Sequence, residues 1–522
     1  MSAAERSWDA IVVGGGFGGL GAALRLVEAG RSVLLLERVG YLGGCACTFE
    51  HEGDHFEGGA TLFAGLGEGE LFGRWIARYG LDVPFERLER PVELRAGAAV
   101  RVSAHRDRAQ FVAGLTALPG APVAALQRFF ALQAAVAERL WALFDEPSLL
   151  PPLTLQSALR HVARSPRYVK LLPLLGRTLW SVLARHGLTR FAPLVHWLDA
   201  QCQITVQCSA READALFAFA ALDYHHRGAA HVRGGIGVLA SELGRAFERA
   251  GGRLQMRSAV SSVERHGGEW RVTARGMTHR ARAVFLNVLP QVAQRIVRGV
   301  DVAPFERAAA RVRTGWGAAA LFRVLAPPLD APPGPLHLEL VDDVAQPFVA
   351  GNHVFLSIGA AGEGVRDPAL RRATASTHVD LNALRALDED GQRRAVDAVH
   401  ARMRETIARR APEWTQCVRE LTASPRTYAR WVGRGDEAPQ GTAAAAIGAA
   451  TGGWVGGHTG GPLKGPLGGW VGGVPRRAGV ALYRELFART GAHGLTLVGD
   501  SVFPGQSTLA CALGAMRGGS RA

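Results

Sequence analysis

The residues of this chain best suited to chemistry are glycines near its start, which could bring backbone amides against a pyrophosphate. Gly14, Gly16 and Gly19 have the spacing GxGxxG. The first glycine permits a tight turn, the second lets the backbone approach the phosphates, and the third lets a helix pack closely on a strand. Glu37 follows where an acidic side chain accepts hydrogen bonds from ribose hydroxyl groups. These residues predict a dinucleotide site.

The elements that must position these glycines follow from the apolar pattern around them. Residues 9–13 form an apolar run typical of a buried strand, residues 20–29 have a helical pattern, and the glycines lie between the two. A second apolar run over residues 32–36 ends at Glu37. Glycines that serve only as turns would not require this order, so we expect a Rossmann-like unit whose helix N-terminus faces phosphates.

More glycine follows Glu37 than an NAD-binding unit needs. Gly43, Gly44 and residues 53–59 lie next in the chain, and a cofactor with a ribityl chain and a flavin ring requires such an extension. The sequence therefore favours FAD over NAD. The predicted cofactor-binding residues of this part are Gly14, Gly16, Phe17, Gly18, Gly19, Glu37, Arg38, Gly43, Gly44, Gly59, Ala60 and Thr61.

A second cofactor-binding segment is predicted near the end of the chain. Residues 495–498 form a short apolar run, residues 499–506 have the sequence GDSVFPGQ, and residues 507–516 can form a helix. Asp500 could accept hydrogen bonds from ribityl hydroxyl groups, and the helix N-terminus could stabilise an anionic reduced flavin. With backbone near Val260 expected beside the adenine, the predicted residues here are Val260, Gly499, Asp500, Gly505, Gln506, Ser507 and Thr508.

Length and composition limit the remaining possibilities. At 522 residues the chain is expected to form two domains, and 48% hydrophobic with 20% charged residues is typical of a globular protein. The net charge of +14 comes from arginine, since Lys170 and Lys464 are the only lysines. We expect no nucleic-acid partner and expect instead a surface attracted to anionic lipid or cofactor. Six cysteines without CxxC or zinc-site spacing predict a reduced protein with no metal site.

The predicted architecture is an interleaved α/β fold. The FAD-binding domain is assigned to residues 1–80, 231–300 and 475–522, and the substrate domain, which is also the part expected to contact membrane, to residues 81–230 and 301–440. Residues 81–230 have a mostly helical pattern. Strands are expected at 336–340 and 353–357 and a helix near 386–410. Residues 441–474 repeat GGWVGG at 452–457 and 468–473 and are expected to form a loop or insertion that buries little.

Membrane contact is expected from one stretch of the helical part. Residues 126–190 combine apolar residues at helical spacing with a later stretch in which arginines alternate with leucines. An ordinary helical cap with a solvated basic face explains the pattern equally well. No run of eighteen bulky apolar residues is present, and the first apolar run already belongs to the nucleotide unit, so we expect a cytoplasmic protein peripherally associated with a membrane.

The GGGFGG module with Glu37, the segment GDSVFPGQS at residues 499–507, and residues 233–237 and 287–290 together resemble the phytoene desaturase and carotenoid isomerase family of FAD proteins, which includes retinol saturases. The resemblance implies a doubly wound, Rossmann-like FAD domain of the amine-oxidase (GR2) type, interleaved with an α+β substrate domain. It also implies a long apolar polyene, drawn from a membrane, that is desaturated or isomerised at the flavin, with hydride transfer to or from flavin N5.

Two departures from this pattern stand out: one copy of GGWVGG and its linker look inserted, and the chain ends soon after the GDSVFPGQS segment. No second GxGxxG unit is found, so oxygen or a quinone is expected as the electron acceptor rather than a nicotinamide. The choice between desaturation, saturation and isomerisation stays open.

Catalytic residues are not identified by any motif. Candidates for handling a proton are Asp223, Tyr224 and His231, with His225 and His226 between them, although a solvated loop explains these residues as well. Two other functions stay open. One is a flavoenzyme similar to amine oxidases or protoporphyrinogen oxidase, and the other is a non-catalytic carrier that binds flavin and carotenoid.

Overall fold

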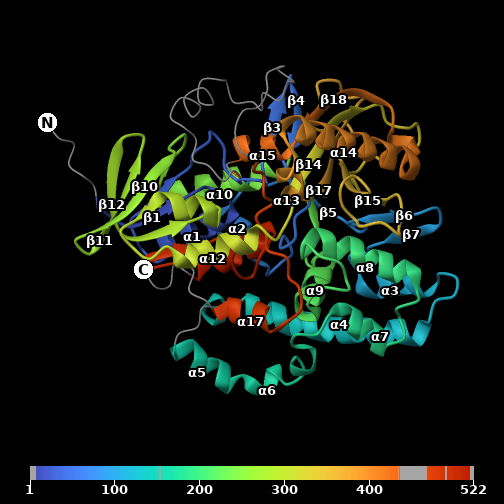
Figure 1. Cartoon of the computed structure of the whole chain (residues 1–522), viewed down its shortest axis with the longest axis horizontal. Helices are drawn as coiled ribbons and strands as arrows, with labels where there is room; N and C mark the ends of the chain where they lie inside the picture. The colour runs from blue at the N-terminus through green and yellow to red at the C-terminus, as the bar shows by residue number, and fades with distance from the viewer. Residues whose placement is uncertain (1–6, 152–154, 433, 435–466, 488–490, 518–522) are drawn as a thin grey trace.

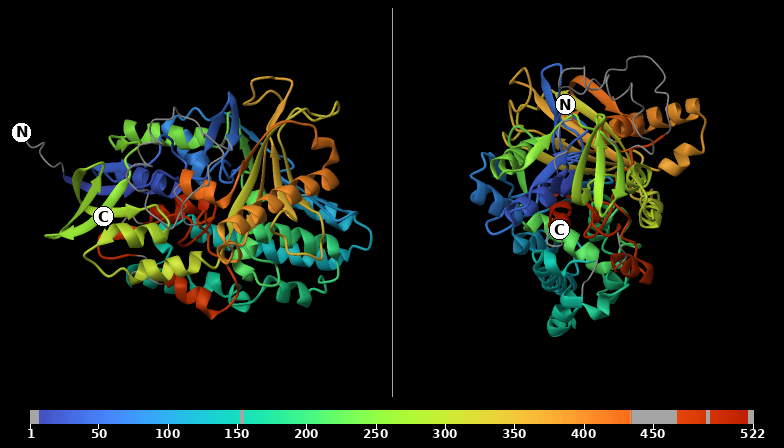
Figure 2. Two further views of the ribbon diagram at one scale, coloured as in Figure 1. Left: turned by 45° about the horizontal axis from the view of Figure 1, so that its top comes forward. Right: turned by 90° about the vertical axis from the view of Figure 1, so that its left-hand side faces the viewer.

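Two β-sheets and a group of helices beneath them make up the protein (Figure 1). The computed structural model describes residues 7–151, 155–432, 434, 467–487 and 491–517. Figure 2 shows the same arrangement from two further directions, with the helices of the 108–222 region on the lower side of the sheets. A mixed α/β fold was predicted, and this prediction is confirmed.

The first sheet has eight strands in the order β13-β10-β11-β12-β1-β2-β9, with β19 also paired to β12. Its bounds are β1 (Ser7–Val13), β2 (Val33–Leu36), β9 (Arg253–Gln255), β10 (Val260–His266), β11 (Glu269–Ala274), β12 (Met277–Leu286), β13 (Val297–Arg298) and β19 (Leu495–Leu497). β1 pairs in parallel with both β2 and β12. The paired parts of β1 and β2, residues 10–13 and 33–36, are wholly apolar and buried because helices cover both faces of the sheet there.

The helices on the two faces of this sheet are distant from one another in sequence. One face packs against α1 (Phe17–Glu28), α10 (Gly237–Arg249) and α18 (Thr508–Met516), and the other against α11 (Pro290–Ile296) and α12 (Ala303–Val312). Successive residues of β1 alternate between these two hydrophobic cores, since side chains alternate across a strand. Segments from both ends of the chain and from its middle therefore build this one sheet and its helical layers.

The second sheet has seven strands in the order β18-β14-β17-β16-β15-β6-β7. Its bounds are β6 (Glu93–Ala96), β7 (Val100–Ser103), β14 (Gly317–Leu325), β15 (Leu336–Val341), β16 (His353–Ile358), β17 (Arg371–Val379) and β18 (Cys417–Ala423). Leucines and valines on its outer face pack against α14 (Glu389–Arg410), next to α13 (Leu381–Arg385). The inner face is turned toward the first sheet and carries polar side chains.

The helical part lies mainly between residues 108 and 222. Its helices are α3 (Arg108–Thr116), α4 (Val123–Phe144), α5 (Leu155–Ala163), α6 (Ser165–Tyr168), α7 (Leu179–Arg185), α8 (Ala192–Thr205) and α9 (Ala215–Leu222). The mostly helical pattern predicted for residues 81–230 misses the β6–β7 hairpin, because two four-residue strands are too short for their period to stand out. None of the described helices is both long and apolar enough to span a bilayer.

The remaining elements connect these parts. Two small two-stranded sheets pair β3 (Thr48–His51) with β4 (Asp54–Glu57), and β5 (Phe85–Arg87) with β8 (Ala230–Val232). Three further helices are α2 (Leu71–Tyr79), α15 (Pro425–Trp431) and α17 (Val480–Phe487), and a short 3-10 helix, η3, covers Asp223–His226.

Residues 467–474, part of the loop or insertion predicted for 441–474, form no helix or strand but are more buried than expected. Trp470 is fully buried, and Leu467 and Val474 join it in a hydrophobic core. The backbone of Trp470 also forms a bridge with Gly317 of β14. The high glycine content concealed three buried apolar side chains, so the second GGWVGG copy is part of the packed structure, while residues 441–466 lie outside the described part.

Candidate active site

A cavity of about 1050 Å³ runs from the carboxyl ends of the first sheet to the inner face of the second. It exceeds the roughly 300–1,000 Å³ that small-molecule sites usually occupy. In open α/β sheets, ligands bind at the carboxyl ends of the strands. The cavity is therefore placed where a nucleotide cofactor is expected, with additional space beyond it.

The glycine-rich turn at one end of the cavity has the shape that a pyrophosphate requires. Gly14 has φ +99°, a left-handed conformation that glycine adopts without strain. A Cβ atom on Gly16 would lie 2.8 Å from Nδ2 of Asn287, and one on Gly19 would collide with the carbonyl oxygen of Gly14. Helix α1 begins here without a side-chain cap, so its first amides are available to an anion.

Glu37 closes the nucleotide end of the cavity at the end of β2. Its Oε2 accepts a hydrogen bond from the Gly15 amide at 2.6 Å, and its Oε1 accepts one from the Val39 amide at 2.9 Å. Burial raises the pKa of this carboxyl, whereas the two amides oppose that shift. Each oxygen keeps a second lone pair for a ribose hydroxyl group, so the side chain fits the adenosine half of FAD.

Most of the predicted cofactor-binding residues line this cavity. They are Gly14, Gly16, Phe17, Gly18, Glu37, Arg38, Gly43, Gly44, Gly59, Ala60, Thr61, Val260, Asp500, Gln506, Ser507 and Thr508. Gly19, Gly499 and Gly505 are not among the lining residues. A Cβ on Gly499 would lie 2.6 Å from Oδ1 of Asn287, so this glycine permits close packing behind the wall. Direct contact of these residues with the cofactor stays a prediction.

Asp500 enters the cavity with a cationic partner that the sequence did not reveal. Arg434 places its guanidinium 2.7 Å from Oδ2 of Asp500 and donates a hydrogen bond to Sγ of Cys45 at 3.1 Å. Burial alone would lower the pKa of Arg434, but the Asp500 carboxylate raises it overall. A single arginine after a stretch without a motif gives no signal in sequence. The pair ties the C-terminal segment to the glycine-rich extension after Glu37.

Only some of the catalytic candidates between residues 223 and 231 line the cavity. Tyr224 and His225 line the cavity, and the Tyr224 hydroxyl group is 2.9 Å from Oγ of Ser507. Burial raises the pKa of Tyr224 to about 12, so the phenol stays protonated near neutral pH. Asp223 instead forms an ion pair with Arg108, and His226 hydrogen-bonds to the backbone oxygen of Arg106.

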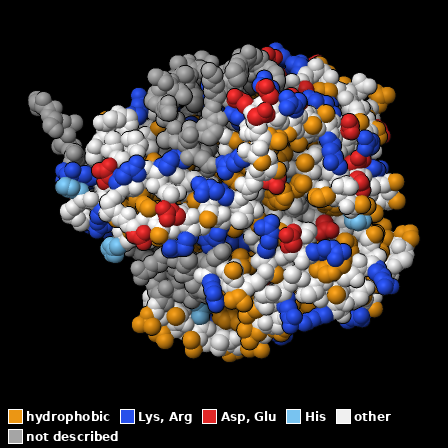
Figure 3. Space-filling model, viewed as in Figure 1, with side chains coloured by type: hydrophobic (Ala, Val, Ile, Leu, Met, Phe, Trp, Pro, Cys, Tyr) orange, Lys and Arg blue, Asp and Glu red, His pale blue; other side chains and the backbone are white. Residues whose placement is uncertain are grey.

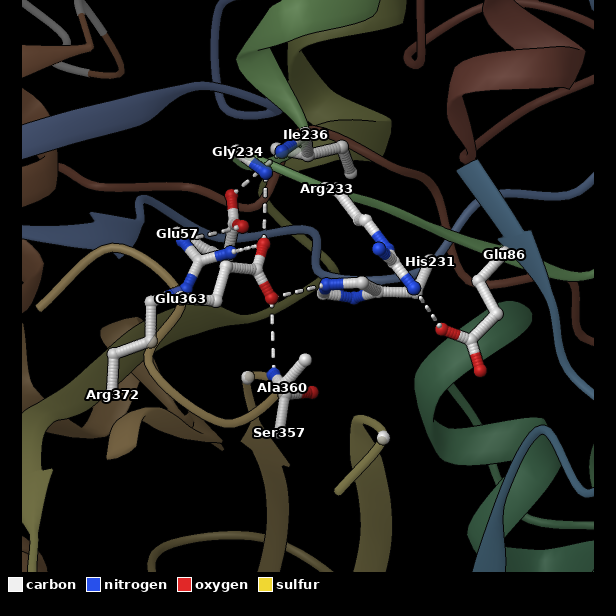
Figure 4. A network of polar contacts seen from close by, with 12 residues as sticks. Glu57, Glu86, His231, Arg233, Gly234, Ile236, Ser357, Ala360, Glu363 and Arg372 are labelled. Carbon is white, nitrogen blue, oxygen red and sulfur yellow. Dashed lines mark hydrogen bonds and ion pairs between the residues drawn. The ribbon is translucent and has the colours of Figure 1, made fainter. Parts of the chain in front are cut away.

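His231 belongs to an ion-pair network that is separate from the cavity lining (Figure 4). Its Nε2 is 2.7 Å from Oε2 of Glu363, and Arg372 binds both Glu363 and Glu57, at 2.7 and 3.0 Å. Burial would raise the pKa of Glu363, but His231 and Arg372 lower it to about 2. The network joins β4, β8 and β17. The structure therefore places His231 in an ion-pair network between strands and not in the cavity wall.

The inner face of the second sheet forms a floor of the cavity that no motif predicted. Its lining side chains include Glu339 on β15, His353 and Phe355 on β16, and Ser376 and His378 on β17. Glu339 lies opposite Phe355, which lies opposite Ser376. The signal for this floor is the alternation of polar residues with leucines in residues 336–341, a pattern that predicts a strand but not which ligand its polar face meets.

Comparison with known proteins agrees with the cofactor geometry. The family model that matches is the flavin-containing amine oxidoreductase, over residues 17–324, more than half of the chain. A solved oxidoreductase from Methanosarcina mazei is similar with a TM-score of 0.60 at 15% identity, covering 98% of this chain and 99% of that one. A putrescine oxidase variant is similar with a TM-score of 0.60 at 14% identity, covering 98% of each chain. These likenesses concern the fold.

Two curated relatives are similar over shorter stretches. A prolycopene isomerase from Daucus carota is 25% identical over 269 residues, which are 50% of this chain and 42% of the relative. A human all-trans-retinol 13,14-reductase is 44% identical over 68 residues, which are 13% and 11% of the two chains. The chain thus spans less than half the length of either relative. Their names agree with the resemblance predicted from the motifs.

Proposed function

The chain belongs to the flavin-containing amine oxidoreductase family and is an FAD-dependent oxidoreductase, and we propose that its substrate is a long apolar polyene of the carotenoid or retinoid class. The observation that carries this proposal is the cavity itself, which continues past the cofactor residues between the sheet floor and helices α8 and α9. Ile204, Ala221 and Phe355 line that part. The names of the two curated relatives support the same substrate class.

The cofactor would be held from both of its ends. The turn from Gly14 to Gly19 would hold the pyrophosphate, Glu37 the adenosine ribose, and Asp500 with the start of α18 the flavin side. Bound FAD supplies an acceptor or donor of hydride at its N5 atom. These two groups of residues, at the two ends of the chain, line one continuous cavity, which supports a flavin dinucleotide as the ligand.

The part of this chain in the reaction would be to orient the substrate and exclude water. Tyr224, held by Ser507, presents a protonated phenol to the cavity, and the sheet floor and helix α8 both line it. Desaturation would transfer one hydrogen of the substrate as hydride and release the other as a proton, and saturation would take up both, so the protein need supply no more than a weak acid or base. We propose oxygen or a quinone as the electron acceptor.

An exposed apolar surface supports peripheral contact with a membrane. On α5, Leu155, Leu159 and Val162 share one helix face and are 81%, 62% and 69% exposed. Val169, Leu172 and Leu175 are also exposed. Figure 3 shows hydrophobic side chains gathered at the lower edge of the molecule, where Figure 1 places α5 and α6. Arg167, Lys170 and Arg177 lie in the same stretch as exposed cations. This α5–α6 surface, residues 155–177, has the composition of a segment that binds anionic lipid.

The test uses anaerobic holoprotein mixed in turn with liposomes that contain phytoene, lycopene isomers or retinol. The flavin absorbance is followed, and the polyenes are then separated by chromatography. Flavin bleaching with a longer conjugated product identifies desaturation, while consumption of prereduced flavin with a shorter one identifies saturation. A changed isomer with flavin retained identifies isomerisation. No altered polyene with either oxidised or reduced flavin would contradict the proposed substrate class, and turnover of an amine instead would replace it. Admitting oxygen or a quinone then tests the acceptor.

A further inference from the structure

A buried carboxyl group faces the cavity from the middle of its floor. Glu339 is 1% exposed and lines the cavity from β15. Across the sheet it lies opposite Phe355, which in turn lies opposite Ser376. Two residues earlier on the same strand, His337 hydrogen-bonds to Ser357, which contacts Thr61. Because Thr61 is a predicted flavin contact, Glu339 lies in the part of the floor that adjoins the cofactor site.

A chain of hydrogen bonds fixes which atom of Glu339 is free. Gln201 on α8 donates from Nε2 to Oε2 of Glu339 at 3.0 Å. The other end of the same amide, Oε1, accepts a hydrogen bond from Nε2 of His225 at 2.8 Å. Among the described residues, Gln201 is the hydrogen-bond partner of Glu339. The Oε1 atom of Glu339 is therefore left for a ligand.

Two histidines of the cavity wall have free ring nitrogens as well. Within the described part of the chain, Nε2 of His353 and Nδ1 of His225 are buried without a hydrogen-bond partner. His378 accepts a hydrogen bond at Nδ1 from Gln203 at 3.0 Å, which places its proton on Nε2. Donors and acceptors in the cavity wall thus exceed the partners that the protein supplies.

These groups are uncharged near neutral pH. Burial raises the pKa of Glu339 to about 8, so its carboxyl group is mostly protonated. Burial lowers the pKa of His225 and of His353 to about 3 and that of His378 to about 4, so their rings are neutral. With Gln201 donating to Oε2, the proton of Glu339 sits on Oε1 and can be donated into the cavity.

A pure hydrocarbon would be a poor ligand for such a floor. A buried polar group that loses water without gaining a partner costs free energy, and a site built for a hydroxyl group rejects the analogue that lacks it. We propose that the floor of the cavity, centred on Glu339, binds the hydroxyl group of a neutral, otherwise apolar substrate. This inference rests on the proposed function and names an alcohol rather than a hydrocarbon within its substrate class.

The test compares one polyene chain with three end groups. All-trans-retinol, the same polyene ending in a methyl group, and the same polyene ending in an amine are titrated into holoprotein in one detergent, with the perturbation of flavin absorbance as the binding signal. The variants are Glu339→Leu, which removes the hydrogen bonds, and Glu339→Gln, which keeps a neutral donor and acceptor. Glu138→Gln, at an exposed position on α4, is the matched control. Comparing ratios between variants cancels the unequal partitioning of the ligands into detergent.

The expected result is an alcohol-to-hydrocarbon affinity ratio at least tenfold higher in the wild-type protein and in Glu138→Gln than in Glu339→Leu, with Glu339→Gln retaining most of it. An equal ratio in wild type and Glu339→Leu overturns the inference while both polyenes still bind. Tightest binding of the amine, lost in Glu339→Gln, also overturns it, since an ammonium group would then pair with an ionised Glu339. Failure of every polyene to bind the wild-type protein contradicts the proposed function itself.

A second measurement does not depend on the leucine variant folding. The infrared C=O stretching band of a protonated carboxyl, assigned by its loss in Glu339→Gln, is expected to shift when the alcohol binds and to stay unchanged when the hydrocarbon binds. A band that responds equally to both ligands overturns the proposal.

Discussion

The carboxyl group of Glu339 links the chemistry of the cavity to the stability of the protein. Its folded-state pKa of about 8 lies above its ordinary value of 4.5 because the side chain is buried. The folded state therefore holds a proton that the unfolded state releases between these two values. Stability falls as the pH rises from about 4.5 to about 8 and changes no further above it, by about 1.4 kcal/mol per pH unit for this one group.

Glu339→Gln removes this ionisation and keeps the side-chain volume. We expect the melting temperature of the variant minus that of the wild type to increase by about 2–4 °C as the pH rises from 5 to 8. The increase is small because a change of a few kcal/mol is divided by the large unfolding entropy of a long chain. Scanning calorimetry of both holoproteins at pH 5, 6, 7 and 8 measures it. Glu138→Gln should follow the wild type at every pH. A constant difference between Glu339→Gln and wild type would show that Glu339 ionises normally in the folded protein.

Residues that belong to a local motif could be predicted from sequence, and residues placed by strand register could not. Gly14, Gly16 and Glu37 follow a spacing that one turn and two strands impose, and the structure places them around one cavity. Glu339 and His353 face that cavity only because β15 and β16 pair in a particular register. A shift by one residue would exchange the two faces of a strand, and a single sequence does not specify it.

At the level of elements, the apolar runs predicted strands such as β15 and β16, whereas the helical pattern of residues 81–230 did not reveal the strands within that stretch. The strands expected at 336–340 and 353–357 correspond to β15 and β16. The mostly helical stretch expected over residues 81–230 also contains the β6–β7 hairpin, which pairs with β15 far along the chain. The β6–β7 hairpin is stabilised by pairing with a strand distant in sequence, and the local periodicity of its residues does not predict that pairing.

The exposed helix α5 should be the element that carries membrane binding. Replacing Leu155, Leu159 and Val162 together with serine removes the apolar face, and we expect binding to anionic vesicles to weaken at least tenfold, because each fully buried side chain of this kind contributes about 1.5–3 kcal/mol. Sedimentation with vesicles of mixed neutral and anionic lipid measures the bound fraction. Added salt should weaken wild-type binding, since Arg167 and Lys170 are exposed cations within the same α5–α6 surface.

The matched control for this experiment changes two exposed apolar side chains elsewhere, Met277→Ser and Leu329→Ser. This variant should bind vesicles as the wild type does. Equal binding by the α5 variant and the control would assign the membrane contact, if any is measured, to another surface.

Across the whole molecule, the cavity proposed to hold the cofactor is lined by segments that are far apart in sequence. The cavity is lined by residues of the first sixty, by Val260 and Asn287 from the middle, and by Asp500 and Thr508 near the end. Helix α18 also packs against α1. A ligand that bridges these segments binds the folded state alone, and it therefore stabilises the entire fold by mass action.

The expected consequence is that adding FAD to apoprotein raises its melting temperature with the logarithm of the FAD concentration, by about 2–3 °C at one hundred times Kd, where the stabilisation is about 2.7 kcal/mol. FMN lacks the AMP half of FAD, so it offers Glu37 no ribose and offers the glycine turn one phosphate in place of two, and at the same concentration it should stabilise less. Glu37→Gln should reduce the shift caused by FAD and leave the shift caused by FMN unchanged. Equal shifts from the two flavins would mean that Glu37 and the AMP half of FAD contribute nothing to binding, and the nucleotide end of the cavity would then need another ligand.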